Sequence, residues 1–342
     1  MRPRRVGCVI VGKRVTAADV ARSLGLSRAT VGFVLNDTPG QSISEATRER
    51  VIAEARRLGY RPHTAARALA SGQSHIVLLL LPDWPVDHAV RSHLDEASLV
   101  LDRAGYSLVT MTPHPGGQAV PLWESLAPDV VMSLAPLSDV QYAAIQATGA
   151  VTLVPGRDDQ GLEGDLGFSE GPRVQAAHLV STGRRRVVFA GSTDPRLRDL
   201  VDQRASLASR SVEELAGSPL FARVDIDAAS VSAVVTEWVR QGVDGVIAYN
   251  DDVAALVVGA ALRAQIPVPQ RLAVIGHDGT PLAALFVPAL STVRVDAAGL
   301  GRFLAELALS RVGAAPAPAT GPECGAHVVA RETTCNGSIL PL

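Results

Sequence analysis

Residues 15–36 read VTAADVARSLGLSRATVGFVLN, and this stretch decides how the N-terminal part of the chain folds. Thr16 precedes an apolar-periodic segment and Asp19 follows three residues later, which predicts an N-cap with a capping box. The first helix then runs to about Leu24. Gly25 is able to adopt the left-handed conformation that ends a helix. A new helix signal follows at once, so the sequence predicts two short helices separated by a tight turn.

The second helix has Ser27 as its predicted N-cap. Its apolar residues fall on one face: Val31, Val34 and Leu35. Residues 36–40, NDTPG, are typical of a loop. Ser44 then caps a third helix that carries Val51, Ala55 and Leu58 at helical spacing and stops at Gly59. The N-terminal part is therefore predicted to be all-helical.

Two short helices joined by a tight turn form a helix-turn-helix, whose second helix enters the major groove of DNA with its N-terminal side chains toward the base edges. Arg28 and Ala29 occupy that end here, with Thr30 just behind. Arginine pairs with the O6 and N7 acceptors of guanine, and alanine packs on a thymine methyl group. The alternative is a small helical bundle in which Arg28 and Thr30 are ordinary surface residues.

The charge distribution supports a nucleic-acid partner. Residues 1–74 hold 13 Lys and Arg against 5 Asp and Glu, whereas the remainder holds 19 against 29, for a net charge of −2. A basic head on an acidic body indicates that a polyanion binds the head. An unstructured basic tail is the other interpretation, but the many helix signals in this segment argue against it.

These motifs together resemble the headpiece of the LacI/GalR family of bacterial transcription regulators. The matching segments are 15–36, ISEATRERV at 43–51 and LGYRP at 58–62. The resemblance implies a headpiece at 15–61, then a hinge helix and linker at 62–74, with Leu69 wedging between base pairs of the minor groove and kinking the duplex. The DNA-contacting residues it implies are Thr16, Ser27, Arg28, Ala29, Thr30, Phe33, Asn36, His63, Ala66 and Leu69.

The headpiece departs from the family pattern at three positions. The family usually reads TVSRVLN where this chain reads TVGFVLN, so Gly32 and Phe33 replace a serine and a DNA-contacting arginine. Glycine costs a helix about 1 kcal/mol relative to alanine. The hinge carries His63 where the family favours asparagine. We therefore expect DNA binding to survive, but the family's usual operator sequence does not transfer to this chain.

From residue 75 onward, strand-like and helix-like segments alternate. The predicted strands are 76–81, 107–111, 130–134, 151–154, 186–190, 245–248 and 272–275, and predicted helices include 95–103, 172–182, 231–241 and 253–265. This rhythm predicts an α/β body of parallel sheets with crossover helices, repeated in two lobes over residues 75–342. In such sheets ligands bind beyond the carboxyl ends of the strands.

The body resembles the periplasmic-binding-protein-like core of the same family. The matching segments are DGVIAYNDDVAA at 244–255, LAVIGHDGTPLA at 272–283, PALSTVR at 288–294 and RETT at 331–334. The first lobe matches more loosely, because Asp83-Trp84-Pro85 stands where the family has Asn-Pro-Phe-Phe. The resemblance implies an effector-binding and dimerisation core.

Ligand contacts are expected from five residues: Asp83, Trp84, Arg204, Asn250 and Asp278. A guanidinium fork, an amide and a carboxylate are able to saturate adjacent hydroxyls of a sugar, and Trp84 is able to stack on its ring. The opposing interpretations are that Trp84 is a core residue and that Asp251 merely caps the following helix. His277 and Gly279 replace an aromatic residue and an aspartate of the family pattern, so the effector need not be the family's usual one.

Other chemistry is absent from the sequence pattern. The three cysteines, Cys8, Cys324 and Cys335, form no metal spacing and no disulfide framework, which favours a cytoplasmic location. No apolar run reaches the length of a membrane span, and the N-terminus is a poor secretory signal. Motifs of hydrolases, P-loop proteins and dinucleotide-binding proteins are missing. We expect neither an enzyme nor a cofactor or metal.

The sequence thus predicts a dimeric, allosteric repressor of carbohydrate uptake or metabolism genes that a small sugar-like effector releases from its DNA operator. A homodimer is expected because only residues 335–342 follow the RETT segment, too few for a tetramerising coiled coil. Two alternatives stay open. One is a corepressor-dependent regulator that responds to a non-sugar ligand, and the other is a cytoplasmic solute-binding protein.

Overall fold

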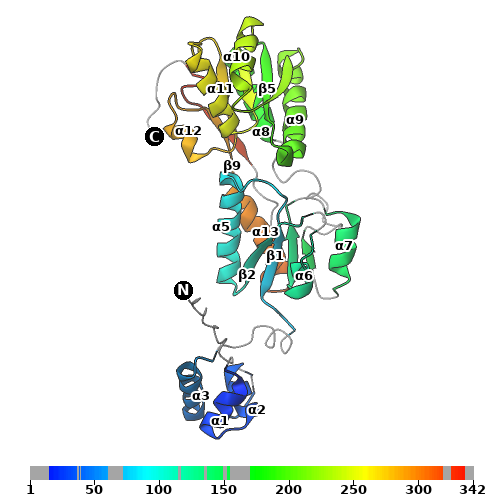
Figure 1. Cartoon of the computed structure of the whole chain (residues 1–342), viewed down its shortest axis with the longest axis vertical. Coiled ribbons are helices and arrows are strands. Elements are labelled where there is room, and N and C mark those ends of the chain that lie inside the picture. The colour runs from blue at the N-terminus through cyan, green and yellow to red at the C-terminus, as the bar shows by residue number, and fades with distance from the viewer. Residues whose placement is uncertain are drawn as a thin grey trace, which may run out of the picture. The chain divides into compact units, whose positions relative to one another are not determined.

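The computed structural model describes residues 15–36, 38, 40–60, 72–114, 117–134, 137–148, 152–154, 170–318 and 325–335. The chain divides into two units, Met1–His75 and Ile76–Leu342 (Figure 1). The proposed hinge residues His63, Ala66 and Leu69 lie outside the described residues. Among the residues described, no helix is both long and apolar enough to traverse a lipid bilayer.

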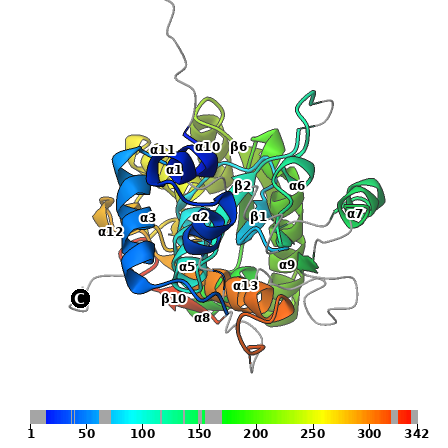
Figure 2. The ribbon, with the colours of Figure 1, turned by 90° about the horizontal axis from the view of Figure 1, so that it is seen from below.

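The described residues of the first unit form the helices α1 (Ala17–Leu24), α2 (Arg28–Leu35) and α3 (Glu45–Arg57), with α3 packed on the other two (Figure 2). The predicted capping box of α1 is present, since the Asp19 N–H donates to Thr16 Oγ1 and the Thr16 N–H donates to Asp19 Oδ2. Gly25 ends α1 with a φ of 68°, a conformation that favours glycine.

Each headpiece helix contributes to one small core. Val20 of α1, Val31 of α2 and Val51 of α3 are completely buried, and Val34 and Ala55 pack beside them. These residues recur at the helical spacing that the sequence predicted, so one face of each helix is apolar. The opposite face of α2 is left on the surface.

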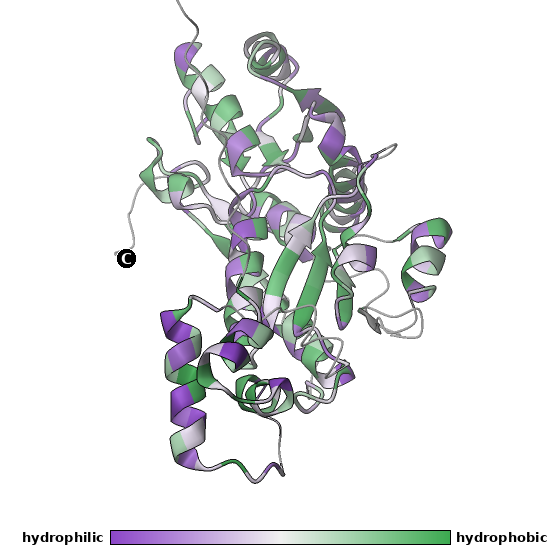
Figure 3. Cartoon of the chain, turned by 60° about the horizontal axis from the view of Figure 1, so that its bottom comes forward, coloured by the Kyte–Doolittle hydropathy of each residue, from purple (hydrophilic) through white to green (hydrophobic). Residues whose placement is uncertain are grey.

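The second unit begins with a four-stranded parallel sheet in the order β2-β1-β3-β4. Its strands are β1 (Ile76–Leu80), β2 (Ser107–Met111), β3 (Val130–Ser133) and β4 (Thr152–Val154). Helices α5 (His88–Arg103), α6 (Leu122–Ser125) and α7 (Asp139–Gln146) connect them. Figure 3 shows the strands of this first lobe as largely hydrophobic, and the residues of β1 and β3 are nearly all buried.

The second lobe repeats this architecture with the strand order β6-β5-β7-β8. Its strands are β5 (Val187–Ser192), β6 (Ala222–Ile226), β7 (Gly245–Ala248) and β8 (Ala273–Ile275). Its helices are α8 (Glu170–Ser181), the short η1 (Pro195–Leu197), α9 (Arg198–Ala216), α10 (Val231–Arg240), α11 (Asp251–Arg263) and α12 (Pro281–Leu285). The predicted pair of parallel sheets with crossover helices is therefore confirmed.

The C-terminal part of the chain links the two lobes. Strand β9 (Thr292–Val295) pairs antiparallel with β10 (Ala326–Val329), and between them α13 (Ala297–Arg311) returns to the first lobe. Helix α13 packs along α5, and its Leu304 shares a buried core with Leu101. The first lobe is thus completed by residues from the far end of the sequence.

Several elements begin earlier than the pattern predicted or were not predicted. Helix α5 starts at His88 instead of residue 95, because the Asp87 side chain caps it by accepting the Val90 N–H at 2.9 Å. Helix α11 starts at Asp251 because Asn250 is its cap. Strand β6 escaped prediction because it is an edge strand in which exposed residues alternate with partly or fully buried ones. The helices given as examples did not include α9 or α13.

Candidate functional site

The first turn of α2 forms the first candidate surface. Arg28 and Ala29 are exposed, and Arg28 makes no hydrogen bond or ion pair with the residues that the structure describes. Ser27 Oγ accepts the Thr30 N–H at 3.0 Å, and the two hydroxyl oxygens lie 2.9 Å apart. Capping therefore holds the start of α2 rigid while the Arg28 guanidinium stays available for a partner.

The same surface continues along α2. Ala29, Phe33 and Asn36 lie four and three residues apart, a spacing that places them on one helix face. All three are exposed, and Phe33 has 36% of its surface accessible. Thr16 is exposed at the start of α1, where its hydroxyl donates to Asp19 Oδ2 at 2.7 Å. The structure thus places every described headpiece residue of the predicted DNA-binding set outside the helical core.

The second candidate site is a cavity of about 70 Å³ in the second unit, where residues of both lobes meet. From the first lobe, Trp84 and Leu134 follow the carboxyl ends of β1 and β3. From the second lobe come Arg204 on α9 and Asp278 after β8. These are the positions at which parallel sheets of this strand order bind ligands. Three of the five predicted ligand residues line this cavity.

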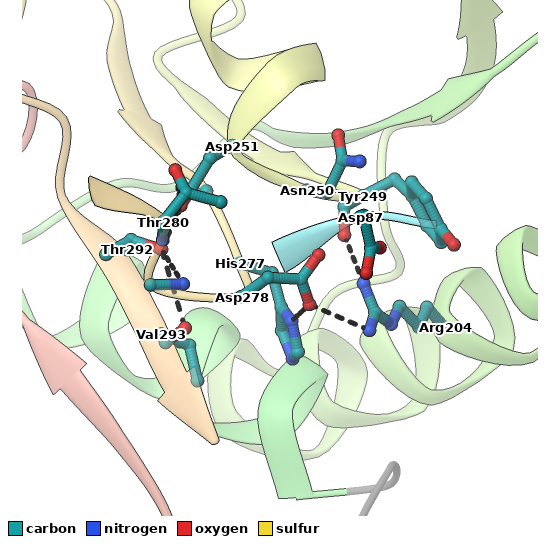
Figure 4. Close-up of polar contacts among 12 residues, drawn as sticks. Asp87, Arg204, Tyr249, Asn250, Asp251, His277, Asp278, Thr280, Thr292 and Val293 are labelled. Atoms are coloured by element: carbon teal, nitrogen blue, oxygen red, sulfur yellow. Dashed lines mark hydrogen bonds and ion pairs between the residues drawn. The ribbon is translucent and has the colours of Figure 1, made fainter. Parts of the chain in front are cut away.

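Arg204 and Asp278 form a buried ion pair at its wall (Figure 4). Arg204 Nη2 lies 3.1 Å from Asp278 Oδ1, and Arg204 Nη1 donates to the Tyr249 carbonyl at 2.7 Å. The two side chains are only 10% and 8% exposed. Burial acts to raise the pKa of Asp278, but the Arg204 guanidinium and the His277 imidazole outweigh it and hold that pKa well below its usual range. Asp278 is therefore a carboxylate at neutral pH.

His277 completes the group. Its Nδ1 lies 2.6 Å from Asp278 Oδ1, while its Nε2 is buried with no partner among the described residues. Gly171 of α8 makes room for the ring, because a Cβ at that position would meet His277 Nε2 at 1.9 Å. Asp278 has a φ of 89°, which is rare for a residue with a side chain. Its contacts with Arg204 and His277 hold it in this strained conformation.

Sequence reasoning missed two residues near the cavity, Asp87 and His93. Desolvation raises the pKa of Asp87, and the nearby Asp278 carboxylate adds to this effect. His93 lines the cavity at 4% exposure, and burial lowers its pKa to about 4. The signal for His93 was its spacing, since it lies four residues before Ala97 on the buried stripe of α5.

The remaining two predicted ligand residues lie outside the cavity wall. Asn250 follows Tyr249, and its Oδ1 accepts the Val253 N–H at 2.9 Å as the cap of α11. This engagement leaves the amide nitrogen and one lone pair of Oδ1 of Asn250 for another partner. Asp83 is exposed and lies near Arg196. The structure therefore groups Trp84, Arg204 and Asp278 but not Asp83 and Asn250.

Asp251 is not a helix cap, so that interpretation was wrong. It is completely buried and accepts hydrogen bonds from the Thr280 N–H at 2.7 Å and from the Thr280 and Thr292 hydroxyls. Burial raises its pKa to about 6. Asp251 thus ties the loop after Asp278 to β9. The described part of the chain holds no group of three His, Cys, Asp or Glu side chains suited to a metal ion.

Comparison with known proteins finds a family match in each of the two units. Residues 16–63 match the bacterial regulatory proteins of the lacI family, and residues 176–334 match the periplasmic binding protein-like domain. The chain is 28% identical to the HTH-type transcriptional regulator GntR of Pseudomonas aeruginosa, over 94% of this chain and 96% of that one. It is 28% identical to the ribose operon repressor of Bacillus subtilis, over 93% and 98%.

Among solved structures, the lac repressor dimer bound to operator and an anti-inducer has the same fold. The TM-score is 0.74 at 21% sequence identity, and the match covers 95% of this chain and all of that one. The headpiece, the two parallel sheets and their order along the sequence thus agree with the family throughout. The chain belongs to the LacI family of transcriptional regulators, with a helix-turn-helix headpiece and a periplasmic-binding-protein-like core.

Proposed function

We propose that this protein is a repressor that binds an operator through the exposed face of α2 and is released from it by a small sugar or sugar derivative. The observation that carries the proposal is the first turn of α2, where Arg28 stands exposed beside Ala29 and pairs with none of the described residues. Such side chains at the N-terminal end of a recognition helix are placed for base edges of the major groove.

The family assignment limits the class of function that this chain has. Its members are transcriptional regulators and not enzymes, and they act in the cytoplasm. We assign DNA reading to residues 15–61, the paired hinge to 62–74, and effector binding and dimerisation to 75–342. Within the hinge, Leu69 is the proposed wedge, with His63 and Ala66 beside it on the DNA.

The cavity supports a polar effector. Arg204 and Asp278 present a donor fork and a carboxylate at its wall, and Trp84 offers an aromatic face. A pattern of this kind suits the hydroxyls and the apolar ring face of a sugar. Two similar proteins with sugar-related names match nearly the whole chain: the ribose operon repressor of Bacillus subtilis matches 93% of it, and the lac repressor structure matches 95%.

Effector control follows from the position of the cavity. Both lobes contribute to its wall, and β9 and β10 connect the lobes. A ligand that binds one lobe arrangement more tightly shifts the population toward that arrangement. We assign the hinge, residues 62–74, the role of carrying this change to the operator. The largest change in the free energy of operator binding equals the difference between the ligand's binding free energies to the two lobe arrangements.

A homodimer is the proposed assembly. Leu282, Leu285 and Val287 on and just after α12 are 47%, 78% and 83% exposed. Exposed apolar side chains gathered in one short segment are typical of an interface. A second copy of the chain is the proposed occupant, because the lac repressor structure is a dimer on its operator.

The test is selection of bound genomic DNA fragments by the purified protein, repeated with a panel of sugars. We expect a near-palindromic motif whose binding weakens with one compound. Arg28→Ala should abolish the motif. Arg22→Ala removes the same charge from α1, where Arg22 pairs with Asp19 at 2.8 Å, and should preserve the motif with somewhat weaker binding.

Three outcomes would contradict the proposal or a part of it. Absence of any enriched motif would reject sequence-specific DNA binding. Tighter operator binding with the active compound would replace release by corepression. A motif that persists in Arg28→Ala would move recognition away from the first turn of α2.

A further inference from the structure

The outward face of α2 has polar ends and an apolar centre. Arg28 is exposed in its first turn and Asn36 is exposed just after its last residue, so both ends carry hydrogen-bonding side chains. Gly32 and Phe33 lie between them, and neither side chain offers a donor or an acceptor. Ala29 lies four residues before Phe33 and extends the apolar centre along one helix face. The middle of α2 is therefore unable to read a polar base edge through side-chain hydrogen bonds.

Phe33 lies outside the core of the headpiece. Its neighbours on the opposite face, Val31 and Val34, are buried, whereas 36% of the Phe33 surface is accessible. An aromatic ring in contact with water lacks the stabilisation that burial of its apolar area supplies. A partner that covers the ring supplies that stabilisation on binding. Because Arg28 stands exposed on the same helix of a basic headpiece, a duplex is the partner whose charge fits.

Gly32 has no role in packing within the headpiece. Glycine inside a helix costs stability relative to alanine, and the backbone of Gly32 is helical, so alanine is able to adopt it. A Cβ at Gly32 would meet no atom of the described residues within 4 Å. Contacts inside the described headpiece therefore do not require the missing side chain. What glycine does provide is close approach of an outside group to the helix backbone.

The major groove of DNA presents one apolar group at its base edges. Thymine carries its C5-methyl group there, whereas the other groups that distinguish the bases are hydrogen-bond donors and acceptors. A phenylalanine ring on a recognition helix is able to pack on this methyl group. The deoxyribose of the groove wall is the other apolar surface within reach of such a ring, but it carries no sequence information.

We propose that Phe33 reads a thymine methyl group in the operator and that Gly32 leaves the space in which this base pair approaches α2. This proposal rests on the proposed function, because the reading takes place on the operator. Each half-site then contains a thymine that is recognised by its methyl group and not by its hydrogen-bonding edge. Phe33 is thus a specificity-determining residue, and it adds to the base contact assigned to Arg28.

The first test removes the methyl group and nothing else. The full-length protein selects duplexes from a random-sequence library, and each thymine of the enriched motif is then replaced by uracil, one symmetric pair at a time. Uracil pairs with adenine as thymine does and keeps the O4 acceptor. We expect one pair of replacements to weaken binding by roughly fourfold for each half-site.

The outcomes of this test separate the two proposals. A motif in which no uracil replacement weakens binding, as contact with deoxyribose alone would give, would overturn the reading of a methyl group and leave the repressor function standing. The same holds for a motif without thymine. Absence of any enriched motif would reject both proposals.

Variants assign the methyl group to one side chain. Phe33→Ala should remove the preference for thymine over uracil at that pair of positions, as a double-mutant comparison of protein and DNA requires. Ile52→Ala shortens an apolar side chain of similar exposure, 37%, on α3 and should keep the preference. A preference that persists in Phe33→Ala would overturn the assignment to Phe33.

Gly32→Ala tests the close approach. We expect it to weaken operator binding by about tenfold, because an added methyl group has no room in a closely packed interface. The same variant should stabilise the helix, since alanine is the better helix former. Opposite signs for stability and for binding distinguish a lost fit to DNA from damage to the fold. Unchanged or tighter binding in Gly32→Ala would overturn the role of Gly32.

Discussion

At the scale of single residues, the cavity depends on a few buried polar groups that hold one another in place. Asp278 adopts a left-handed backbone conformation between Arg204 and His277. The side chains of Arg204 and Asp278 are only 10% and 8% exposed. A buried ion pair is strongly destabilising when only one member is removed, because the other charge is left uncompensated. Removal of one member of the Arg204–Asp278 pair should therefore give a measurable loss of stability.

Asp278→Asn should lower the free energy of unfolding by about 3 kcal/mol, because it leaves the Arg204 guanidinium buried without its counter-charge. Asparagine tolerates a positive φ, so the loss reflects charge and not backbone strain. The measurement is denaturant unfolding followed by circular dichroism. The double variant Arg204→Gln with Asp278→Asn should recover part of the loss. Equal stabilities of Asp278→Asn and the parent would refute a stabilising pair.

His93 should make stability depend on pH. Its folded pKa of about 4 lies below the value of 6.5 for an unperturbed histidine, so the unfolded chain binds the extra proton between these values. The contribution of the neutral His93 ring to the free energy of unfolding is therefore fully present above pH 6.5. It is lost as the pH drops toward 4, and the free energy of unfolding falls by up to about 3 kcal/mol. His93→Leu should remove this loss.

The comparison of unfolding at pH 7 and pH 4 isolates the effect of His93 as a difference between the two proteins. Asp251, with its pKa raised to about 6, acts in the opposite direction, because its ionisation disfavours the folded state as the pH rises from 4 to 6. It is present in both proteins and cancels. A parallel pH dependence of parent and variant would exclude His93 as the source.

At the scale of elements, caps decide where helices begin and end, and glycines show what each helix tolerates. Gly32 lies inside α2 and Gly25 ends α1, and a Cβ at either position would meet no atom within 4 Å. Packing is therefore equal at the two sites, and only the backbone conformation differs. Gly25 has a φ of 68°, whereas Gly32 is helical.

Gly32→Ala should stabilise the headpiece by up to about 1 kcal/mol, because alanine loses less backbone entropy in a helix. Gly25→Ala should destabilise it by about 1 kcal/mol, because alanine disfavours the left-handed conformation. Amide hydrogen exchange of Val31 and Val34 in α2 measures the opening free energy of this unit. The same sign of change in both variants would contradict the argument from backbone conformation.

At the scale of the whole molecule, binding of a palindromic operator needs two headpieces. Leu285→Glu places a charge in the exposed apolar segment at the end of α12 and should convert the dimer to a monomer in sedimentation, with weaker operator binding. Leu215→Glu changes another exposed leucine, 48% accessible on α9, and should leave the dimer intact. A dimer that persists in Leu285→Glu would place the interface elsewhere.

Local sequence was sufficient for much of the headpiece and for the architecture of the body. The helices from Thr16 to Leu58 follow from caps, a stop glycine and apolar spacing, all of which act within a few residues. The alternation of apolar runs with helical segments likewise predicted two parallel sheets. Arg204 and Asp278 were identified through family motifs rather than through spacing. Trp84 was identified through its aromatic ring at a place where the family motif is missing, and the structure brings all three to one cavity.

The tertiary structure alone decided the chemistry of that cavity. Asp87 and His93 from α5 meet Asp278 and Asp296, which lie about 200 residues later, and no local pattern encodes that meeting. The pKa of His93 and the charge balance of the wall depend on burial and on through-space neighbours. Sequence by itself therefore determined which elements form, because their signals are local, whereas only the packing of the two lobes decided which charges face one another.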